Sequence, residues 1–234
     1  MNKTISLKKE NLENEFYRFD PKYYFVKNDI KKIKNSKKFK SHNIADLGIE
    51  ISSGSYIDEY VTYSDGIPYI RVGNIKSFSI NDSIRNTKYV SSEVPEKVKV
   101  KKNEIVIPRT QNKEQMLGVA SLVDLEDFSI ATSQHVSKLS FENSGVSPFF
   151  LVAYLNSKFY LHQLALASHG DTRVELTHSQ FKSIEVIFPT DSDINEIIKK
   201  VKKIILLNRK IVNLYKDIDD YVNKLLKLDE LKIS

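Results

Sequence analysis

The sequence predicts an α+β protein in which a β-rich domain with packed helices precedes one long C-terminal helix. Three observations support this prediction. Short β-branched runs, separated by turn residues, fill residues 42–190, as is typical of a sheet-rich domain. A helical stretch interrupts them after Ser147-Pro148, where serine caps and proline starts a helix. Residues 191–228 contain no proline or glycine and carry apolar residues at heptad spacing.

The composition bounds the class of protein. A chain of 234 residues with 41% hydrophobic residues can bury one sizeable core and carry an appendage. There is no cysteine, which excludes disulfides, zinc–thiolate sites and thiol nucleophiles. No run of 18 apolar residues occurs, and residues 1–10 lack the apolar run of a signal peptide. We therefore expect a cytoplasmic protein with no membrane partner.

Charge is distributed unevenly along the chain, whose net charge is +6. Residues 1–40 hold 12 Lys/Arg and 5 Asp/Glu, whereas residues 41–190 hold 14 and 17. A basic total favours a nucleic-acid partner. Because the middle segment is slightly acidic, any DNA reading there must depend on local basic loops rather than on a general positive field. The other interpretation of the charge is a lysine-rich solvated surface.

A helix is predicted in the N-terminal lead-in, residues 1–41. Asp20-Pro21 suits an N-cap followed by proline at the first helical position, so the helix would run from Pro21 to about Asn35. Lysines gather at its end, where cations interact well with the helix dipole. Contact with DNA phosphates is the alternative role for them. These residues are Lys31, Lys32, Lys34, Lys37, Lys38 and Lys40.

Five apolar runs are predicted as strands of the β-rich domain, residues 42–190. One helix from Phe149 to Ala167 interrupts them, and a short helix is expected to begin at the cap Thr177. The predicted strands are Ile67–Val72, Glu104–Ile107, Leu117–Val123, His135–Leu139 and Ile184–Pro189.

The segment 191–234 is predicted as one long helix with a heptad stripe. A helix of about 36 residues is some 54 Å long, too long to bury its whole stripe on a small domain. We therefore expect a second long helix as its partner; packing along its own domain is the alternative. A lone polar residue in such a stripe, Asn208, commonly fixes register. The predicted dimerisation residues are Ile197, Val201, Ile204, Asn208, Ile211, Tyr215, Ile218, Val222 and Leu225.

The order of these features resembles a known family. A β-rich domain opens at Ser52-Ser53-Gly54, closes at Ile187-Phe188-Pro189, and is followed at once by the long helix. It is similar to the specificity subunits of type I restriction–modification enzymes, in a half-size form with one target-recognition domain. It also resembles recognition subunits of type IIB and IIG systems. Between the two ends the similar phrases are Gly66–Ile75, Lys102–Val106 and Leu176–Ile184.

The resemblance implies a non-catalytic role. Residues 42–190 would be the target-recognition domain and would bind double-stranded DNA. The partners implied are methyltransferase subunits, restriction subunits where the system also cleaves DNA, and a second half-subunit, identical or different. S-adenosylmethionine would be bound by the methyltransferase, so this chain would carry no cofactor. In the family the long helices pack antiparallel and space two DNA half-sites. A coiled-coil scaffold that binds no DNA is the alternative function.

Motifs for catalysis are absent from the sequence. There is no Pro-Pro pair, as an adenine methyltransferase motif would need, and no phosphate loop. The five histidines lack metal-ligand spacing. The carboxylates Asp124, Glu126 and Asp127 could chelate a metal, but they lie between strands and fit a turn better.

Candidate base-reading residues follow from the chemistry of the major groove, where arginine reads guanine and asparagine or glutamine reads adenine. The first segment, expected to be a loop right after a strand, combines all three types; an ordinary polar hairpin tip is the alternative. The second, Ser168 to Arg173, places His169 and Arg173 on either side of a glycine. The third is Arg71, Asn74 and Lys76, although Arg71 could instead pair with a carboxylate. The first segment consists of Arg109, Thr110, Gln111, Asn112 and Lys113.

Overall fold

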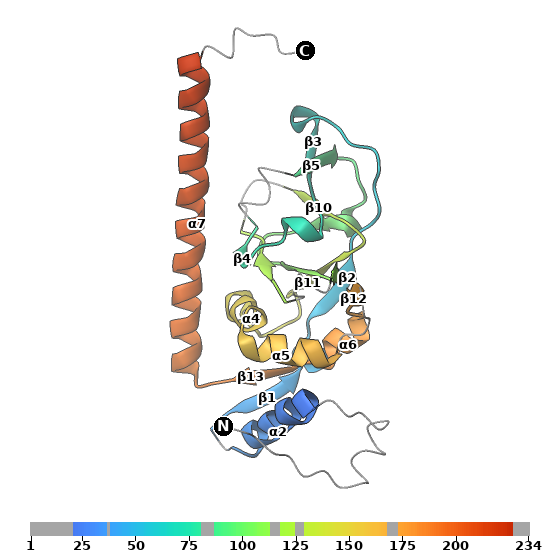
Figure 1. Ribbon diagram of the computed structural model, residues 1–234, viewed down its shortest axis with the longest axis vertical. Helices are drawn as coiled ribbons and strands as arrows, with labels where there is room; N and C mark the ends of the chain where they lie inside the picture. Colours follow the sequence, from blue (N-terminus) through green and yellow to red (C-terminus); the bar gives the residue numbers. More distant parts are fainter. Residues whose placement is uncertain are drawn as a thin grey trace.

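The computed structural model describes residues 21–36, 38–80, 87–112, 118–124, 129–167 and 173–226. A β-rich body stands beside one long helix, α7 (Asp191–Leu226), which runs along the longest dimension of the molecule (Figure 1). This arrangement confirms the predicted α+β class and the long C-terminal helix. No described helix is long and apolar enough to cross a membrane.

A five-stranded sheet forms the middle of the body, with strand order β2-β11-β7-β9-β4. Its pairs are antiparallel except for β4 and β9, which are parallel. Its central strand β7 is fully buried because Ile105, Val106 and Ile107 pack on both faces of the sheet. The strands are β2 (Glu50–Ser53), β4 (Phe78–Ser79), β7 (Ile105–Pro108), β9 (Ser121–Leu122) and β11 (Val136–Ser140).

A four-stranded sheet lies at the end of the body away from the N-terminal helix, with strand order β5-β3-β10-β6 (Figure 1). The pair β3–β10 is parallel, and the other pairs are antiparallel. Two small apolar clusters, one around Ile70 and Ile130 and one around Tyr69 and Val90, hold this sheet. Its strands are β3 (Gly66–Ile70), β5 (Lys88–Ser91), β6 (Lys99–Val100) and β10 (Ile130–Thr132).

The largest apolar cluster joins the five-stranded sheet to the helices α4 (Pro148–Leu155), α5 (Lys158–Ala167) and α6 (His178–Lys182). The single helix predicted over Phe149–Ala167 is therefore wrong. The chain turns at Asn156, whose side chain donates to the carbonyl oxygens of Ala120 (2.8 Å) and Val152 (2.7 Å). Ser157 then accepts a hydrogen bond from the amide of Tyr160 and starts α5.

Other predicted boundaries also changed. The predicted strand Leu117–Val123 is shorter, since only Ser121–Leu122 pair as β9. Gly118 has a φ of +122°, outside the extended region, and its close approach to Leu161 leaves no room for a Cβ. Ser147 precedes α4 but its side chain makes no capping hydrogen bond. The other four predicted strands are confirmed, as are the helix α2 (Pro21–Asn35) and the capping role of Thr177.

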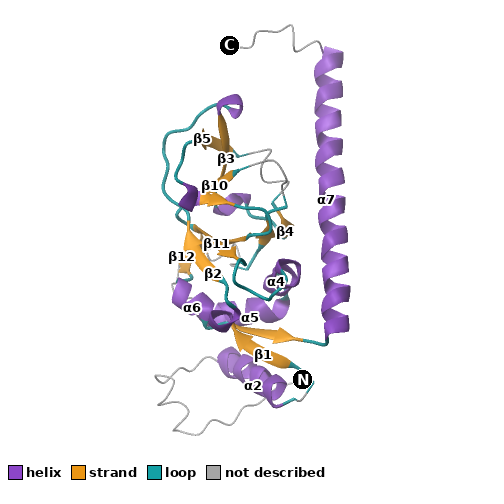
Figure 2. Ribbon diagram, turned by 180° about the vertical axis from the view of Figure 1, so that it is seen from behind, coloured by secondary structure: helices purple, strands orange, loops and turns teal. Residues whose placement is uncertain are grey.

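The base of the molecule connects the body to α7. The strands β1 (Lys40–Asn43) and β13 (Glu185–Phe188) pair antiparallel, and α7 begins three residues after β13 at Asp191. Thr190 caps the helix, because its Oγ1 accepts from the amide of Asp193 (3.3 Å). Figure 2 shows α7 leaving this point and passing α4 on its way along the body.

Packing of α7 differs along its length. In its first part Val201 and Ile205 are buried in the main core, with Ile194, Ile197 and Ile198 packed beside them. This part of the helix therefore packs along its own domain, which was the alternative to pairing with a second long helix. From Leu206 onward the large apolar side chains are exposed, among them Ile211, Tyr215, Ile218, Val222 and Leu225.

Candidate nucleic-acid interface

Two strands far apart in the sequence form a two-stranded antiparallel ribbon. They are β8 (Thr110–Asn112) and β12 (Arg173–Glu175), with Asn112 opposite Arg173 and Thr110 opposite Glu175. The ribbon thus joins the first and second predicted base-reading segments, which are about 60 residues apart in the chain. Both were expected to be loops, which is wrong for Thr110–Asn112 and for Arg173, because the two segments pair with each other as strands. Together with α6, β12 lies on the side of the body opposite to α7 (Figures 1 and 2).

The base of the ribbon is tied to the sheet by its backbone. Strand β8 continues β7 with one residue between them, Arg109, whose amide donates to the carbonyl of His135 (2.8 Å). The carbonyl of Arg109 accepts from the amide of Leu176 (2.8 Å), which follows β12. The next residue, Thr177, forms a capping box with Gln180 at the start of α6. Both strands are therefore fixed where they enter the body.

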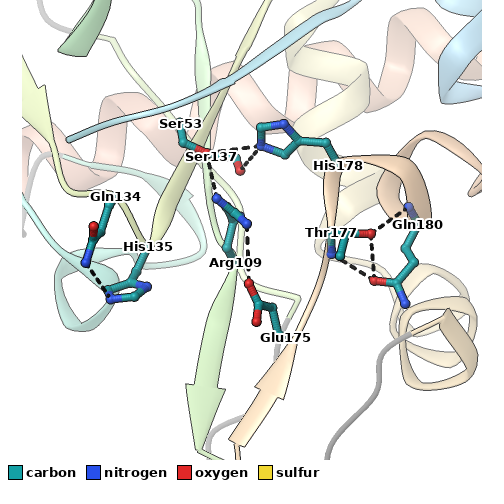
Figure 3. A network of polar contacts seen from close by, with 9 residues as sticks. All are labelled: Ser53, Arg109, Gln134, His135, Ser137, Glu175, Thr177, His178 and Gln180. Carbon is teal, nitrogen blue, oxygen red and sulfur yellow. Dashed lines mark hydrogen bonds and ion pairs between the residues drawn. The ribbon is translucent and has the colours of Figure 1, made fainter. Parts of the chain in front are cut away.

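The Arg109 side chain makes its contacts within this base rather than in open solvent. Its Nη1 donates to Ser53 Oγ (3.0 Å), and its Nη2 pairs with Glu175 Oε1 (3.3 Å) (Figure 3). The side chain is 26% exposed, and its Nε is buried without a hydrogen-bond partner among the described residues. A buried unpaired donor costs about 1–3 kcal/mol. The contacts of Nη1 and Nη2 therefore do not by themselves account for the position of the guanidinium.

His178 completes the cluster from the start of α6. Its Nε2 lies 3.1 Å from Ser53 Oγ and 3.0 Å from Ser137 Oγ, as Figure 3 shows. Burial lowers the pKa of His178, and the positive charges of Arg109 and Lys182 lower that pKa further. We call Ser53, Arg109, Ser137, Glu175 and His178 the ribbon-base cluster. Its members come from β2, the β7–β8 junction, β11, β12 and α6.

The third predicted group lies at the end of β3. The Asn74 side chain accepts from the amide of Arg71 (3.0 Å) and from Thr87 Oγ1 (3.3 Å), which holds the short 3₁₀ turn Val72–Asn74. Arg71 and Lys76 have exposed side chains. The amide of Lys76 donates to Ser121 Oγ. None of the contacts that the structure gives these three residues reaches the ribbon, so the structure does not join this group to the other two.

The remaining predicted residues are placed only in part. Lys113 and His169 lie outside the described residues. Gln111, Asn112 and Arg173 are placed by their backbone register in the ribbon, and Thr110 is buried at its base. Within the described ranges, no three His, Asp or Glu residues are arranged to hold a metal ion.

Sequence analysis missed four members of the ribbon-base cluster: Ser53, Ser137, Glu175 and His178. The only sequence signal for them was their place in the phrases that carry the family resemblance, which include Ser53 and His178. The pairing of β8 with β12 has no local signal, because neither strand is longer than three residues. A two-stranded ribbon has the width that the major groove of B-DNA admits.

Comparison with known proteins gives the family. The model of the type I restriction modification DNA specificity domain matches residues 28–214, which is most of the chain. It covers both the β-rich body and the larger part of α7. The family is that of a specificity domain rather than of a methyltransferase or nuclease, which agrees with the expectation of a non-catalytic chain. Among the curated proteins, none matches the chain.

Solved structures show the same fold at low sequence identity. The type IIG restriction endonuclease BpuSI has a TM-score of 0.60 at 12% identity, over 84% of this chain and 30% of its own. The type I restriction–modification S subunit from M. genitalium has a TM-score of 0.53 at 18% identity, over 84% and 48%. A chain from a structural study of assembly and conformational transition in the type I R-M system gives 0.52 at 9% identity, over 92% and 53%.

The chain spans about half the length of the two type I chains that it matches, at 48% and 53%. At least 84% of this chain is aligned in each case. With a family match over residues 28–214, the chain belongs to the family of type I restriction modification DNA specificity domains.

Proposed function

We propose that this chain reads one half of a bipartite DNA target and directs a partner adenine methyltransferase to it. S-adenosylmethionine is bound by that methyltransferase, and restriction subunits join where the system also cleaves. The family match favours this role over the alternative of a scaffold that binds no DNA. Under this proposal the purified chain neither methylates nor cuts DNA. Incorporation of labelled methyl groups by the chain alone would contradict it.

The β8–β12 ribbon is the observation that supports DNA reading most directly. It combines an asparagine and an arginine, the two residue types that make bidentate contacts to adenine and guanine, at opposite register positions. Strand β8 continues β7 of the five-stranded sheet and β12 leads into α6, so the ribbon is held at the base of both strands. In this role Asn112 and Arg173 contact base edges, with Gln111 between Asn112 and the body.

The test of this role compares substitutions in the ribbon with one far from it. Asn112→Ala and Arg173→Ala should each weaken binding to the cognate site by about 1–3 kcal/mol and relax specificity at one base position. Asn213→Ala, at an exposed position of α7 away from the ribbon, is the matched control. The binding is measured by gel shift with cognate and scrambled duplexes in the presence of the methyltransferase. Unchanged affinity and specificity in both ribbon variants would contradict the assignment.

The second copy is proposed to pair through the exposed part of α7. Five residues of the predicted stripe, from Ile211 to Leu225, have exposed side chains. Of these five, Tyr215 also makes contacts within this chain. An antiparallel partner helix would bury them and place two ribbons about a twofold axis. The target is then an interrupted palindrome, because the symmetry of the site mirrors that of the protein.

The gap between the two half-sites is expected to be fixed by the helix. A helix of 36 residues is about 54 Å long, which corresponds to at most some 16 base pairs at about 3.4 Å each. Changing the gap by one pair rotates one half-site by about 34–36°. Mapping of methylated adenines, with this chain as the only specificity protein, measures both properties. An asymmetric two-part target would refute the homodimer and indicate a different second half.

A further inference from the structure

The chemistry of the ribbon-base cluster determines which of its groups donate hydrogen bonds and which accept them. An arginine can only donate hydrogen bonds, so Ser53 Oγ accepts from Arg109 Nη1. The hydroxyl hydrogen of Ser53 is then free to point at His178 Nε2, which lies 3.1 Å away. Ser137, which is 1% exposed, has no other acceptor than this same nitrogen in the described part of the chain. When Nε2 carries no proton, its single lone pair can accept from either serine hydroxyl, and the two hydroxyls share it.

Protonation of His178 to the imidazolium would disturb this arrangement in two ways, because Nε2 would then be a donor. It would leave the buried Ser137 hydroxyl hydrogen without an acceptor, and a buried unpaired polar group costs free energy. It would also place a second positive charge in the cluster that already holds the Arg109 guanidinium. The charged groups that face His178 are Arg109 from the β7–β8 junction and Lys182 from its own helix, both positive. The carboxylate of Glu175 on β12 is already paired with Arg109.

The position of the cluster connects it to DNA reading. Arg109 is the residue between β7 and β8, and Glu175 ends β12, so the Arg109–Glu175 pair joins the two strands of the ribbon. Ser53 of β2 accepts from the guanidinium, and His178 of α6 contacts the same serine hydroxyl. A change in the charge of His178 therefore acts directly on the residue that spans the ribbon base.

We propose that Arg109 is a positioning residue rather than a base reader, and that His178 makes the hold of Arg109 on the β8–β12 ribbon sensitive to protons. This inference rests on the proposed reading role of the ribbon. When His178 is neutral, the relay from Arg109 through Ser53 to His178 keeps the ribbon in its reading position. When His178 is protonated, Nε2 becomes a donor and adds a positive charge beside the guanidinium, so Arg109 is held less firmly and specific DNA binding weakens.

The same group affects the stability of the fold, with a defined sign. The pKa of His178 is lowered in the folded protein from about 6.5 in the unfolded chain. The unfolded state therefore binds the proton more readily, and stability falls as the pH decreases through about 6.5 toward the lowered pKa. Above about pH 6.5 this penalty is absent. Binding measurements must therefore be made where the protein is shown to be folded, by circular dichroism at each pH.

The deciding experiment is a pH profile of binding to cognate and scrambled DNA for the wild type and His178→Gln, with the methyltransferase present. Gln places a neutral acceptor near the position of Nε2, so it keeps the relay without titrating. We expect cognate binding by the wild type to weaken as the pH falls below about 6.5, with a slope of up to about tenfold per pH unit. His178→Gln should lose this dependence, whereas His162→Gln, at an exposed position on α5, should keep it.

A second pair of variants separates positioning from base reading. Arg109→Lys keeps a charge and one donor toward Ser53, so it should retain the pattern of base preference with reduced affinity. Arg109→Met should reduce affinity for cognate DNA and abolish the pH dependence, because the relay has no donor. If Arg109→Met instead relaxed preference at one base position and kept the wild-type pH profile, Arg109 would be a base reader and the inference would be wrong.

Different results would contradict the inference about His178 and the proposed reading function of the ribbon. If the wild type binds cognate DNA specifically but His178→Gln has the same pH profile, the relay has no such role. If the wild type shows no preference for any sequence at any pH, and Asn112→Ala changes nothing, the reading role of the ribbon fails first. A wild-type profile that is flat over the whole pH range in which the protein stays folded, with specific binding, also overturns the inference.

Discussion

The two parts of α7 carry the same kind of heptad pattern but lie in different surroundings. In the first part Val201 is 2% exposed and Ile205 is 4% exposed, both within the main core. In the second part Ile218 is 57% exposed and Leu225 is 63% exposed. Arg209 lies between the two parts, where its Nη2 contacts the carbonyl oxygen (2.7 Å) and the carboxylate (2.8 Å) of Asp124.

This difference shows that a heptad stripe specifies burial but not the partner that provides it. The helix is longer than the body segment against which it packs, so part of the stripe is used within the chain and the rest is left for another surface. The first part of α7 then belongs to the fold, and the second part belongs to assembly. Substitutions in the two parts should have opposite patterns of effect on stability and on association.

The largest effect is expected where a charge would replace a buried apolar side chain. Val201→Asp and Ile205→Asp should each destabilise the monomer by several kcal/mol, because an unpaired carboxylate would be buried in the main core. Chemical denaturation at a protein concentration below that of dimerisation measures this effect. The matched control is Ile218→Asp, which should leave the same unfolding midpoint nearly unchanged. Equal loss of stability in the control would mean that the whole helix packs on the body.

The next effect concerns assembly. Ile211→Asp and Ile218→Asp should abolish dimerisation, because each would place a charge in an apolar helix–helix contact. Light scattering at tens of micromolar, with and without the methyltransferase, distinguishes the two states. Asn213→Ala, on the same turn but outside the stripe, should remain dimeric. A wild type that is monomeric under both conditions would remove the basis for the twofold arrangement.

Local signals in the sequence predicted the elements that are determined locally. Thr177 was predicted to cap a short helix, and it caps α6; the long helix α7 begins at Asp191, where the predicted helical segment begins, with Thr190 as its cap. The apolar runs in β7 and β13 became strands because their side chains reach the core. The break at Asn156 was missed because it depends on a carbonyl oxygen of Ala120, 36 residues away.

The pairing of segments that are far apart in the chain could not be predicted from the sequence alone. The two base-reading segments were predicted separately, and their union in one ribbon depends on the fold between them. For the same reason His178, which has no metal-ligand spacing, became interpretable only when Ser53 and Ser137 were seen beside it. The division of α7 into two parts also depends on where the body ends, which a heptad pattern does not contain.

A smaller effect is expected at the boundary between the two parts of α7. Arg209→Ala should destabilise the monomer by about 1–2 kcal/mol, because it leaves the mostly buried Asp124 carboxylate without its charged partner. Asp124→Asn keeps an acceptor and should cost less than this. Lys216→Ala, an exposed cation on the same helix, is the control and should change stability little. Denaturation midpoints measure all three, and a loss in Lys216→Ala equal to that in Arg209→Ala would indicate a general charge effect.

The smallest change in free energy is expected at Asn208, the one polar residue of the predicted stripe and half-buried in the structure. It lies just before Arg209, so it belongs to the turn where the stripe passes from the body to the exposed surface. Asn208→Leu adds apolar surface to the stripe, which should strengthen dimerisation by on the order of 1 kcal/mol or less. It also removes the polar group that favours one register of the two helices.

We therefore expect a tighter but less uniform dimer, in which cross-links between cysteines placed at exposed positions of α7 form in more than one register. Sedimentation gives the dissociation constant and the cross-linking pattern gives the register. If Asn208→Leu instead destabilised the monomer as Val201→Asp is expected to do, Asn208 would belong to the part of α7 that packs on the body.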